Sequence, residues 1–256
     1  MSGGDVLVGA LLGFVAGLLA GLFGVGGGIV TTPGIQHLLG ATPIQAVATP
    51  LPIILPTSLV GAYTYGRAGE VDRLAAAWAV VPGLGGAVVG ALLTEAVNPH
   101  ALLLITALLL GWTAFRVMRG SDAPHERRRP APGWAFAGVG LVAGLVSGLL
   151  GVGGGIVLVP AFTLLGMPLK RALGTSLLCI AALVVPATLT HWLLGHIDWA
   201  IVLVVTLGVV PGVRLGARLA LGAQERVLRL MVGTFLLCVA VAYGVAELSE
   251  LLRGRG

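Results

Sequence analysis

The chain has 256 residues, of which 57% are apolar and only 10% are charged, and its mean hydropathy is +1.03. Water-soluble domains carry about 25% charged residues, so this composition excludes an ordinary soluble domain, a coiled coil and a disordered chain. The net charge of +5 is more typical of the cytoplasmic loops of a membrane protein than of a nucleic-acid site. We therefore expect the chain to contact membrane lipid and not to bind nucleic acid.

Long uncharged segments follow one another along the chain. The first covers the 61 residues between Asp5 and Arg67, and the later ones are 74–94, 96–115, 130–169, 172–197, 199–213 and 230–246. A membrane-crossing helix needs roughly 20 mostly apolar residues. These segments are continuously apolar and do not alternate, which excludes outer-membrane strands. The sequence therefore predicts an all-α polytopic membrane protein.

The first uncharged segment contains two glycine patterns. Gly24-Val-Gly-Gly-Gly28 is a cluster, and adjacent glycines are poor helix interior and allow positive φ. We therefore expect a broken or re-entrant helical hairpin, with a short helix from Ile29 whose free N–H groups and dipole attract anions. The other glycines recur every four residues on one helix face, which favours close helix packing: Gly9, Gly13, Gly17 and Gly21.

The second half of the chain repeats the first. Residues 13–33 align without gaps on 140–160, and 15 of the 21 positions are identical. The spaced glycines recur as Gly140, Gly144 and Gly148, and Gly151-Val-Gly-Gly-Gly155 predicts a second short helix from Ile156. With one residue deleted, Thr49 aligns with Thr175 and Asp72 with Asp198, both aspartates being expected to cap helices. We place the repeats at 5–119 and 132–253, joined by a basic linker at 120–131.

The distribution of basic residues predicts the topology. If each half had four ordinary crossings, nine basic residues would lie on one side and six on the other. If the first segment of each half instead returns at its glycine cluster, thirteen lie inside and only Arg253 and Arg255 outside. Basic residues concentrate on the cytoplasmic side, so we favour the second arrangement. Each half then has three spanning helices, and the halves form inverted-topology repeats, as in many secondary transporters.

Polar groups inside the uncharged segments are the candidate ligands of a small anion. His191 aligns with Tyr65, and this pair is a candidate for proton coupling or gating, with a structural histidine as the alternative. Lys170 and Arg171 form a possible anion entrance, or serve only as topology determinants. Each hydroxyl could instead bond its own helix carbonyl. The predicted binding groups are the backbone N–H groups of Gly26, Gly27, Gly28, Gly153, Gly154 and Gly155 and the hydroxyls of Thr31, Thr49, Thr175 and Ser176.

The duplicated pattern Gly-x-x-x-Gly-x-x-x-Gly-x-x-Gly-x-Gly-Gly-Gly-x-x-x-x-Pro, at 13–33 and 140–160, resembles the TauE/SafE family of sulfite exporters. Arg171-Ala-Leu-Gly-Thr-Ser176 is similar to another segment of that family. The resemblance covers essentially the whole chain. It implies a multi-pass permease of the cell inner membrane, with a cytoplasmic linker, that moves sulfur oxyanions or organosulfonates such as sulfite or sulfoacetate, usually outward. The first half departs from the pattern, with Ala48 and Pro50 in place of Gly174 and Ser176.

Other functions are weaker alternatives. Ser176 and His191 invite an intramembrane hydrolase, but no glycine follows the serine and there is no His-Glu-x-x-His motif. An anion channel, or a permease for a non-sulfur substrate, also fits the composition. Few carboxylates lie in the apolar segments, which disfavours a divalent cation site, and no cofactor or metal is expected. Cys179 and Cys238 are expected as small buried thiols, and self-association into a homo-oligomer is left open.

Overall fold

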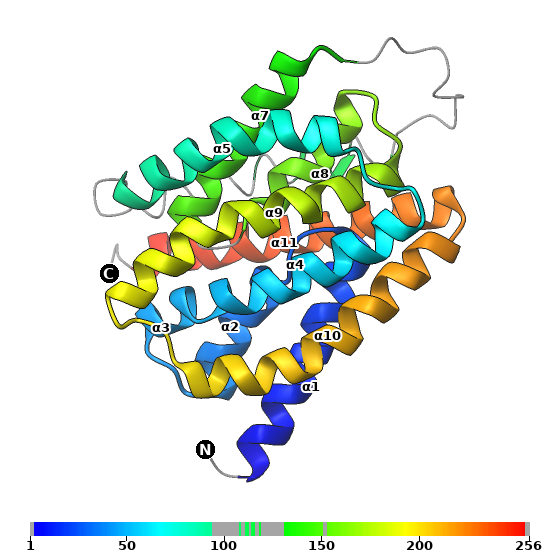
Figure 1. Ribbon diagram of the computed structural model, residues 1–256. Coiled ribbons are helices and arrows are strands. Elements are labelled where there is room, and N and C mark those ends of the chain that lie inside the picture. The colour runs from blue at the N-terminus through cyan, green and yellow to red at the C-terminus, as the bar shows by residue number, and fades with distance from the viewer. Residues whose placement is uncertain are drawn as a thin grey trace.

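The structure is a computed structural model that describes residues 3–93, 131–150 and 153–253, together with 108, 111, 112, 114, 115 and 118. The predicted linker at 120–131 lies outside the described residues except for its last position. Every regular element in the described chain is helical, in agreement with the predicted all-α class (Figure 1). The first repeat contains α1 (Gly3–Phe23), α2 (Gly28–Leu38), α3 (Pro43–Ala48), α4 (Pro50–Arg67) and α5 (Arg73–Leu93). The second contains α7 (Gly133–Leu150), α8 (Gly155–Leu164), α9 (Leu169–Leu193), α10 (Trp199–Gly222) and α11 (Glu225–Arg253).

Several of these helices are long enough to cross a membrane. In the described chain, five segments combine sufficient length with an apolar composition: α1, Ile44–Arg67, α5, α9 and α10. An α-helix rises 1.5 Å per residue, so about 20 residues span the hydrocarbon core. The prediction of a multi-pass helical membrane protein is confirmed.

Both glycine clusters break the helix, as predicted. Gly27 has φ 87° and forms the N-cap of α2, while Gly154 has φ 71° and forms the N-cap of α8. Each short helix begins one residue earlier than expected, at Gly28 and Gly155. This shift follows because the left-handed N-cap is the last non-helical residue, so the third glycine of each triplet takes the first helical position.

After the first break the chain turns back along α1. Gly34 of α2 packs against the Leu12 side chain, and a Cβ on Gly9 would lie 3.7 Å from Leu39 Cδ1. The residue numbers rise along α2 while those of the contacted residues fall along α1. Helices α1 and α2 therefore form an antiparallel hairpin that begins and ends at the same end of the molecule.

The spaced glycines bring helices of different repeats into backbone contact. On α1, a Cβ at Gly13, Gly17 or Gly21 would overlap the carbonyl oxygen of Val205, Val209 or Val213 on α10. The glycines of α10 reciprocate, so the missing side chains allow the two helices to approach closely. The predicted packing role of these glycines is confirmed. The reciprocal contacts are those of Gly208, Gly212 and Gly216 with the carbonyl oxygens of Ala10, Phe14 and Leu18.

The equivalent pair, α5 and α7, packs in the same way. Gly140 and Gly144 of α7 lie against the carbonyl oxygens of Ala79 and Gly83 on α5. Helix α1 of the first repeat therefore packs on α10 of the second, and α7 of the second repeat packs on α5 of the first. This exchange interlocks the repeats, so neither forms a separate domain.

Helices α4 and α9 pack against each other in antiparallel orientation. The N–H of Asp198, just after α9, donates to Thr49 Oγ1 before α4, at 3.2 Å. The N–H of Asp72, after α4, donates to Thr175 Oγ1 near the start of α9, at 2.9 Å. The start of each helix thus lies beside the end of the other. One carboxylate oxygen of each aspartate also accepts from N–H groups in the first turn of the following helix, which confirms the predicted capping.

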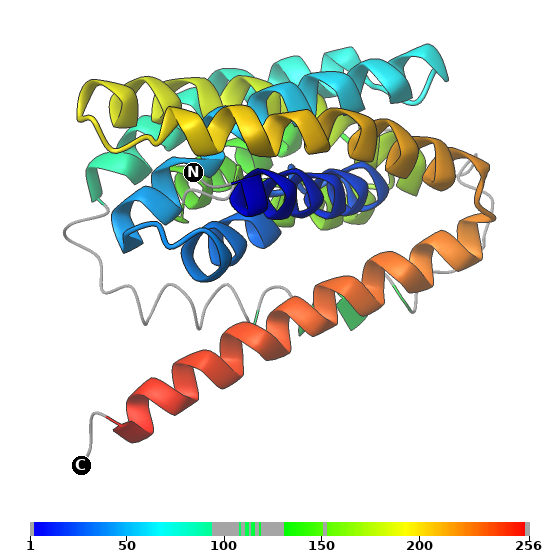
Figure 2. The same ribbon diagram turned by 90° about the horizontal axis from the view of Figure 1, so that it is seen from below.

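Helix α11 runs along one side of the other helices (Figure 2). Its Phe235 ring stacks on Phe23 at the end of α1, with ring centroids 4.3 Å apart. Both cysteines are free thiols; Cys179 on α9 is buried, as predicted, but Cys238 is exposed. The prediction for Cys238 was wrong because Cys238 lies on an exposed face of α11, together with Leu237 and Val241.

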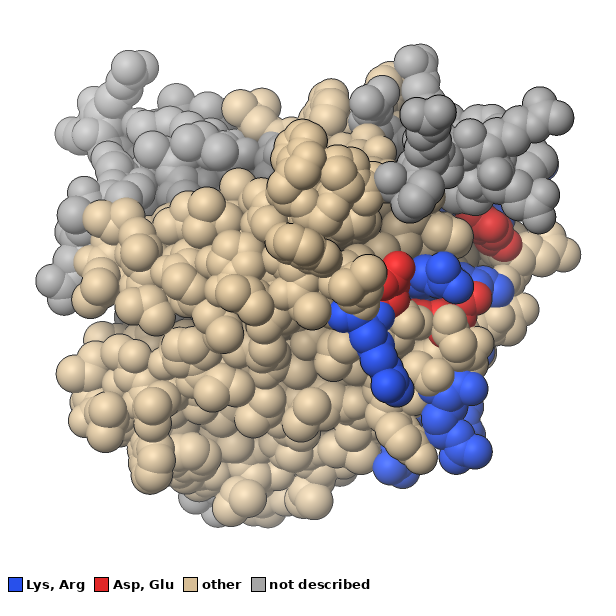
Figure 3. All heavy atoms as spheres, turned by 45° about the horizontal axis from the view of Figure 1, so that its top comes forward, with Lys and Arg blue, Asp and Glu red and all other residues tan. Residues whose placement is uncertain are grey.

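Eight basic side chains gather at one end of the molecule, together with nearby acidic side chains. Figure 3 shows Lys, Arg, Asp and Glu clustered on one part of the visible face, and the remaining described surface in that view is uncharged. The connection from α4 to α5, the start of α9 and the passage from α10 to α11 meet at this end (Figure 1). The basic residues of these segments are Arg67, Arg73, Lys170, Arg171, Arg214, Arg218, Arg226 and Arg229.

Candidate functional site

The two glycine breaks converge on one pair of isoleucines. A Cβ on Gly26 would lie 3.2 Å from Cγ2 of both Ile54 and Ile180, and a Cβ on Gly153 would lie 3.4 and 3.1 Å from the same two atoms. Ile54 and Ile180 occupy equivalent positions in the repeats, as Gly26 and Gly153 do. Equivalent glycines of the two repeats therefore contact the same two equivalent isoleucines.

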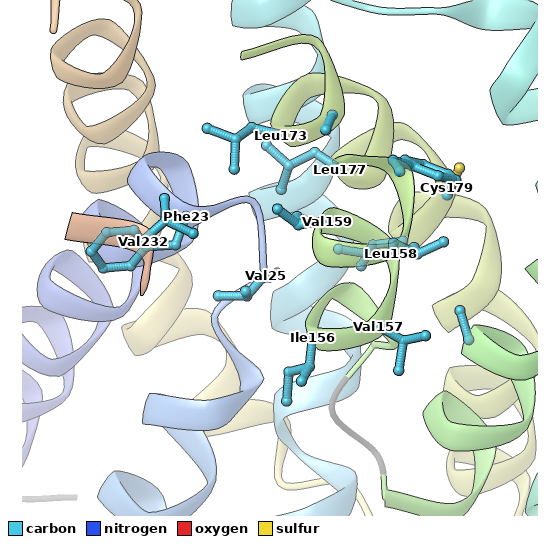
Figure 4. Packing of buried hydrophobic residues seen from close by; sticks show 14 of the residues in the cluster. Phe23, Val25, Ile156, Val157, Leu158, Val159, Leu173, Leu177, Cys179 and Val232 are labelled. Carbon is cyan, nitrogen blue, oxygen red and sulfur yellow. The ribbon is translucent and has the colours of Figure 1, made fainter. Parts of the chain in front are cut away.

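The breaks also touch each other directly. A Cβ on Gly155, the first residue of α8, would lie 2.7 Å from the Cα of Val25 between α1 and α2. Figure 4 shows this segment with Val25 beside the helix that carries Ile156, within the buried cluster. The structure thus brings together the N-termini of two short helices, each preceded by left-handed glycines. Sequence reasoning passed over Ile54 and Ile180, although their alignment as identical residues was available as a signal.

Backbone N–H groups at both breaks are buried and without acceptors among the described residues. In the first break these are the N–H groups of Gly26, Gly27 and Gly28, whereas the N–H groups of Val30 and Thr31 already donate to Gly27 O. The second break repeats this pattern with Gly153–Gly155. Buried N–H groups are rarely left unpaired. At a helix N-terminus they carry the positive end of the helix dipole, so this arrangement suits an anion.

The four hydroxyls of the predicted site have protein partners. Thr31 Oγ1 donates to Gly27 O at 3.2 Å, and Ser176 Oγ donates to Gly24 O at 2.5 Å. Thr49 and Thr175 accept the N–H groups of the other repeat that were described above. Thr31 therefore bonds a carbonyl oxygen of its own helix turn, as the alternative interpretation expected. Ser176 connects the first break to α9.

Tyr65 and His191 lie at opposite ends of the molecule, since they occupy the last turns of two antiparallel helices. The Tyr65 hydroxyl is buried and donates to Gly21 O at 2.9 Å. His191 is half-buried, and its Nδ1 lies 3.3 Å from Nδ1 of His196. Ser176 precedes His191 by 15 residues of the same helix, a separation of about 22 Å at 1.5 Å per residue. The Ser–His hydrolase alternative is therefore contradicted.

Lys170 and Arg171 take different positions at the charged end. Lys170 Nζ donates to Leu221 O at 2.7 Å and so binds a carbonyl in the last turn of α10. Arg171 is exposed. Among the described residues, no group of three or more His, Cys, Asp or Glu side chains is placed to hold a metal ion.

Comparisons with known proteins agree with this architecture. The model of the family described as sulfite exporter TauE/SafE matches residues 9–243. The chain is 29% identical over 241 residues to a probable membrane transporter protein of Xylella fastidiosa strain 9a5c, covering 91% of each chain. It is 27% identical over 242 residues to the probable membrane transporter protein YunE of Bacillus subtilis strain 168, covering 84% of this chain and 87% of YunE. No solved structure matches.

Proposed function

Because the chain belongs to the TauE/SafE family of sulfite exporters, we propose that it carries a small sulfur oxyanion or organosulfonate, such as sulfite or sulfoacetate, outward across the membrane. The family resemblance inferred from the duplicated glycine motif is confirmed. The family consists of transporters, and the relatives are named probable membrane transporters. An enzymatic function is thereby excluded, and the substrate and direction are the proposal.

The contact between the two glycine breaks is the observation that carries this proposal. Each break presents buried N–H groups at the N-terminus of a short helix, at Gly26–Gly28 and at Gly153–Gly155. An anion between them would accept hydrogen bonds from both breaks and interact favourably with both helix dipoles. Thr31 and Ser176 hold the first break in place through its carbonyl oxygens.

We propose alternating access by inverted-topology repeats as the mechanism. The antiparallel packing of the equivalent helices α4 and α9 supports it, as does the return of α2 along α1. The hydrogen bonds of Thr49 and Thr175 lie at opposite ends of this helix pair. A rocking motion between α4 and α9 would open one of these ends while the other stays closed, which exposes the central site to each side in turn.

The charged end is proposed as the cytoplasmic side of the cell inner membrane. Asp72 lies between Arg67 and Arg73 in the chain, and its N–H donates to Thr175 near the start of α9. The basic residues on both sides of this contact therefore share one end, which supports the arrangement with thirteen basic residues inside. The linker at 120–131 would lie on this side, between repeats at 5–119 and 132–253. Arg171, exposed there, would attract anions to the entrance. His191, at the opposite end, would take part in proton coupling or gating.

Purified protein in lipid vesicles tests the proposal. We expect sulfite or an organosulfonate to cross faster than in protein-free vesicles, and a pH gradient to change the rate if protons are coupled. Sulfate and thiosulfate serve as comparison anions. Movement of none of these anions would contradict the proposed function.

Site-directed labelling tests the topology separately. Single cysteines introduced by Gly3→Cys and Ala41→Cys, in a background without Cys179 and Cys238, should be labelled from the same membrane face. Labelling from opposite faces would contradict the re-entrant hairpin.

A further inference from the structure

Two buried serine hydroxyls have no hydrogen-bond partner among the described residues: those of Ser58 and Ser147. Ser58 is 0% exposed and Ser147 is 1% exposed. Burying a polar group without a partner destabilises the folded state, so native proteins rarely retain one without a reason. The other buried hydroxyls of the described chain have partners, namely those of Thr31, Thr49, Thr57, Tyr65, Thr175 and Ser176.

Ser147 lies beside the second glycine break. It belongs to α7, and its Cβ is 3.3 Å from the position of a Cβ on Gly154, the N-cap of α8. The equivalent residue in the first repeat is Ala20, whose Cβ is 3.5 Å from the corresponding position on Gly27. The second break therefore has a hydroxyl where the first has only a methyl group.

Ser58 belongs to α4, the helix that contacts the first break through Ile54. It lies one helical turn after Ile54, whose Cγ2 is 3.2 Å from the Cβ position of Gly26. Residues four apart share a helix face, so Ser58 occupies the face of α4 that meets this break. Its equivalent in the second repeat is Val184, whose Cγ1 is 3.5 Å from the Cβ position of Gly153. Ser147 therefore lies next to the second break and Ser58 one helical turn from the residue that contacts the first, and each serine replaces an apolar residue of the other repeat.

We propose that Ser58 and Ser147 donate the side-chain hydrogen bonds to the transported anion, one at each glycine break. This proposal rests on the proposed function and deepens it. The ligand class is a small oxyanion with acceptor oxygens on two sides, held by backbone N–H groups and two hydroxyls. Because the serines come from non-equivalent positions, the two sides of the bound anion meet different groups although the backbone is nearly symmetric.

A ligand role and a structural role predict opposite changes in stability. Removal of a hydroxyl that is unpaired in the empty protein should stabilise that state. The same removal should weaken anion binding, because a hydrogen bond to a charged ligand is lost. A serine that merely supports the fold would destabilise the empty protein when it is removed.

The experiment measures thermal unfolding of the purified protein in detergent, without anion and with increasing sodium sulfite or sodium sulfate. Ser58→Ala and Ser147→Ala should each raise the apparent Kd for the stabilising anion by about tenfold or more. Each should also raise the Tm of the anion-free protein by about 2–4 °C. Thr57→Val is the matched control, because this buried neighbour of Ser58 already donates to Ile53 O at 2.6 Å. Its Tm should fall while its Kd stays at the wild-type value.

The outcomes separate this proposal from the function on which it rests. If the anion stabilises the wild-type protein and both alanine variants bind it with an unchanged Kd, only the role of the serines is overturned. If no tested anion stabilises the wild-type protein, and none crosses the membrane of vesicles that contain it, both proposals are overturned. If an alanine variant does not fold, Ser58→Cys or Ser147→Cys makes the same comparison, since a thiol is a weak donor of similar size.

Discussion

Alanine in place of the left-handed glycines Gly27 and Gly154 gives the sharpest test of the central site. Both residues have positive φ, at 87° and 71°. A side chain in this region costs roughly 1–2 kcal/mol, because Cβ approaches the following carbonyl oxygen. This backbone cost is common to Gly27→Ala and Gly154→Ala, and it distorts the segments that aim the N–H groups at the site.

The surroundings of the two glycines distinguish the variants. A Cβ on Gly154 would lie 2.6 Å from the carbonyl oxygen of Ala143, whereas the nearest atom to a Cβ on Gly27, Ala16 O, lies 3.4 Å away. Backbone must move to relieve the first contact, and overpacking of this kind costs about 1–3 kcal/mol more. We therefore expect Gly27→Ala to lose about 1–2 kcal/mol of stability and Gly154→Ala about 2–5 kcal/mol.

Gly69→Ala separates strain from loss of the site. Gly69 has φ 76° and no atom within 4 Å of its Cβ position, and it lies between α4 and α5, away from the breaks. In denaturant unfolding, Gly69→Ala should lose as much stability as Gly27→Ala. Its transport of the substrate anion in vesicles should persist. Gly27→Ala should insert into the membrane and transport little or nothing. Equal transport by these two variants would refute the role of the first break, and a more stable Gly154→Ala than Gly27→Ala would refute the steric argument.

The remaining predictions concern contacts between helices, and unfolding in detergent measures each of them. Thr49→Val and Thr175→Val should each cost about 1 kcal/mol, and the double variant should cost their sum because the bonds lie at opposite ends of the helix pair; a strongly non-additive result would contradict this separation. Gly17→Leu should abolish the packing of α1 on α10 and leave no monodisperse folded protein, whereas Gly138→Ala, with open space around its Cβ position, should be tolerated. Tyr65→Phe should cost about 1 kcal/mol through its lost hydrogen bond, and an unchanged stability would show that this bond contributes nothing.

Local features of the fold were predictable where a residue type has few conformations available to it. The glycine triplets predicted the helix breaks to within one residue, because three adjacent glycines disfavour a helix wherever they lie. The four-residue spacing of Gly13, Gly17 and Gly21 predicted a face for close packing. It did not predict that α10 covers this face, because spacing identifies the face of a helix and not its partner. The exchange of partners between repeats depends on the packing of the whole chain.

The hydroxyls of the site were harder to predict for the same reason. Thr31 could be expected to reach the carbonyl oxygen four residues back, and it does. Ser176 reaches Gly24 O in the other repeat, a contact that no local pattern indicates. Ser147 attracted no attention in the sequence, since it differs from its equivalent Ala20 by a single oxygen atom. Whether a hydroxyl is already paired depends on its tertiary neighbours, so the sequence identifies the candidates and the structure separates them.

The packing also indicates which parts of the molecule can move relative to one another. Backbone contacts through Gly17 on α1 and Gly144 on α7 leave no side chains to rearrange, so the pairs α1–α10 and α5–α7 should each move as a unit. At the α4–α9 interface Gly174 approaches Glu70 O closely, and one hydrogen bond at each end joins the repeats, through Thr49 and Thr175. Each such bond contributes only about 1 kcal/mol, which a small binding energy can offset. A motion that breaks one bond and keeps the other would therefore pivot about the end that stays closed. Ile54 and Ile180 lie between the two breaks in this interface, where such a pivot would change access to the proposed anion site.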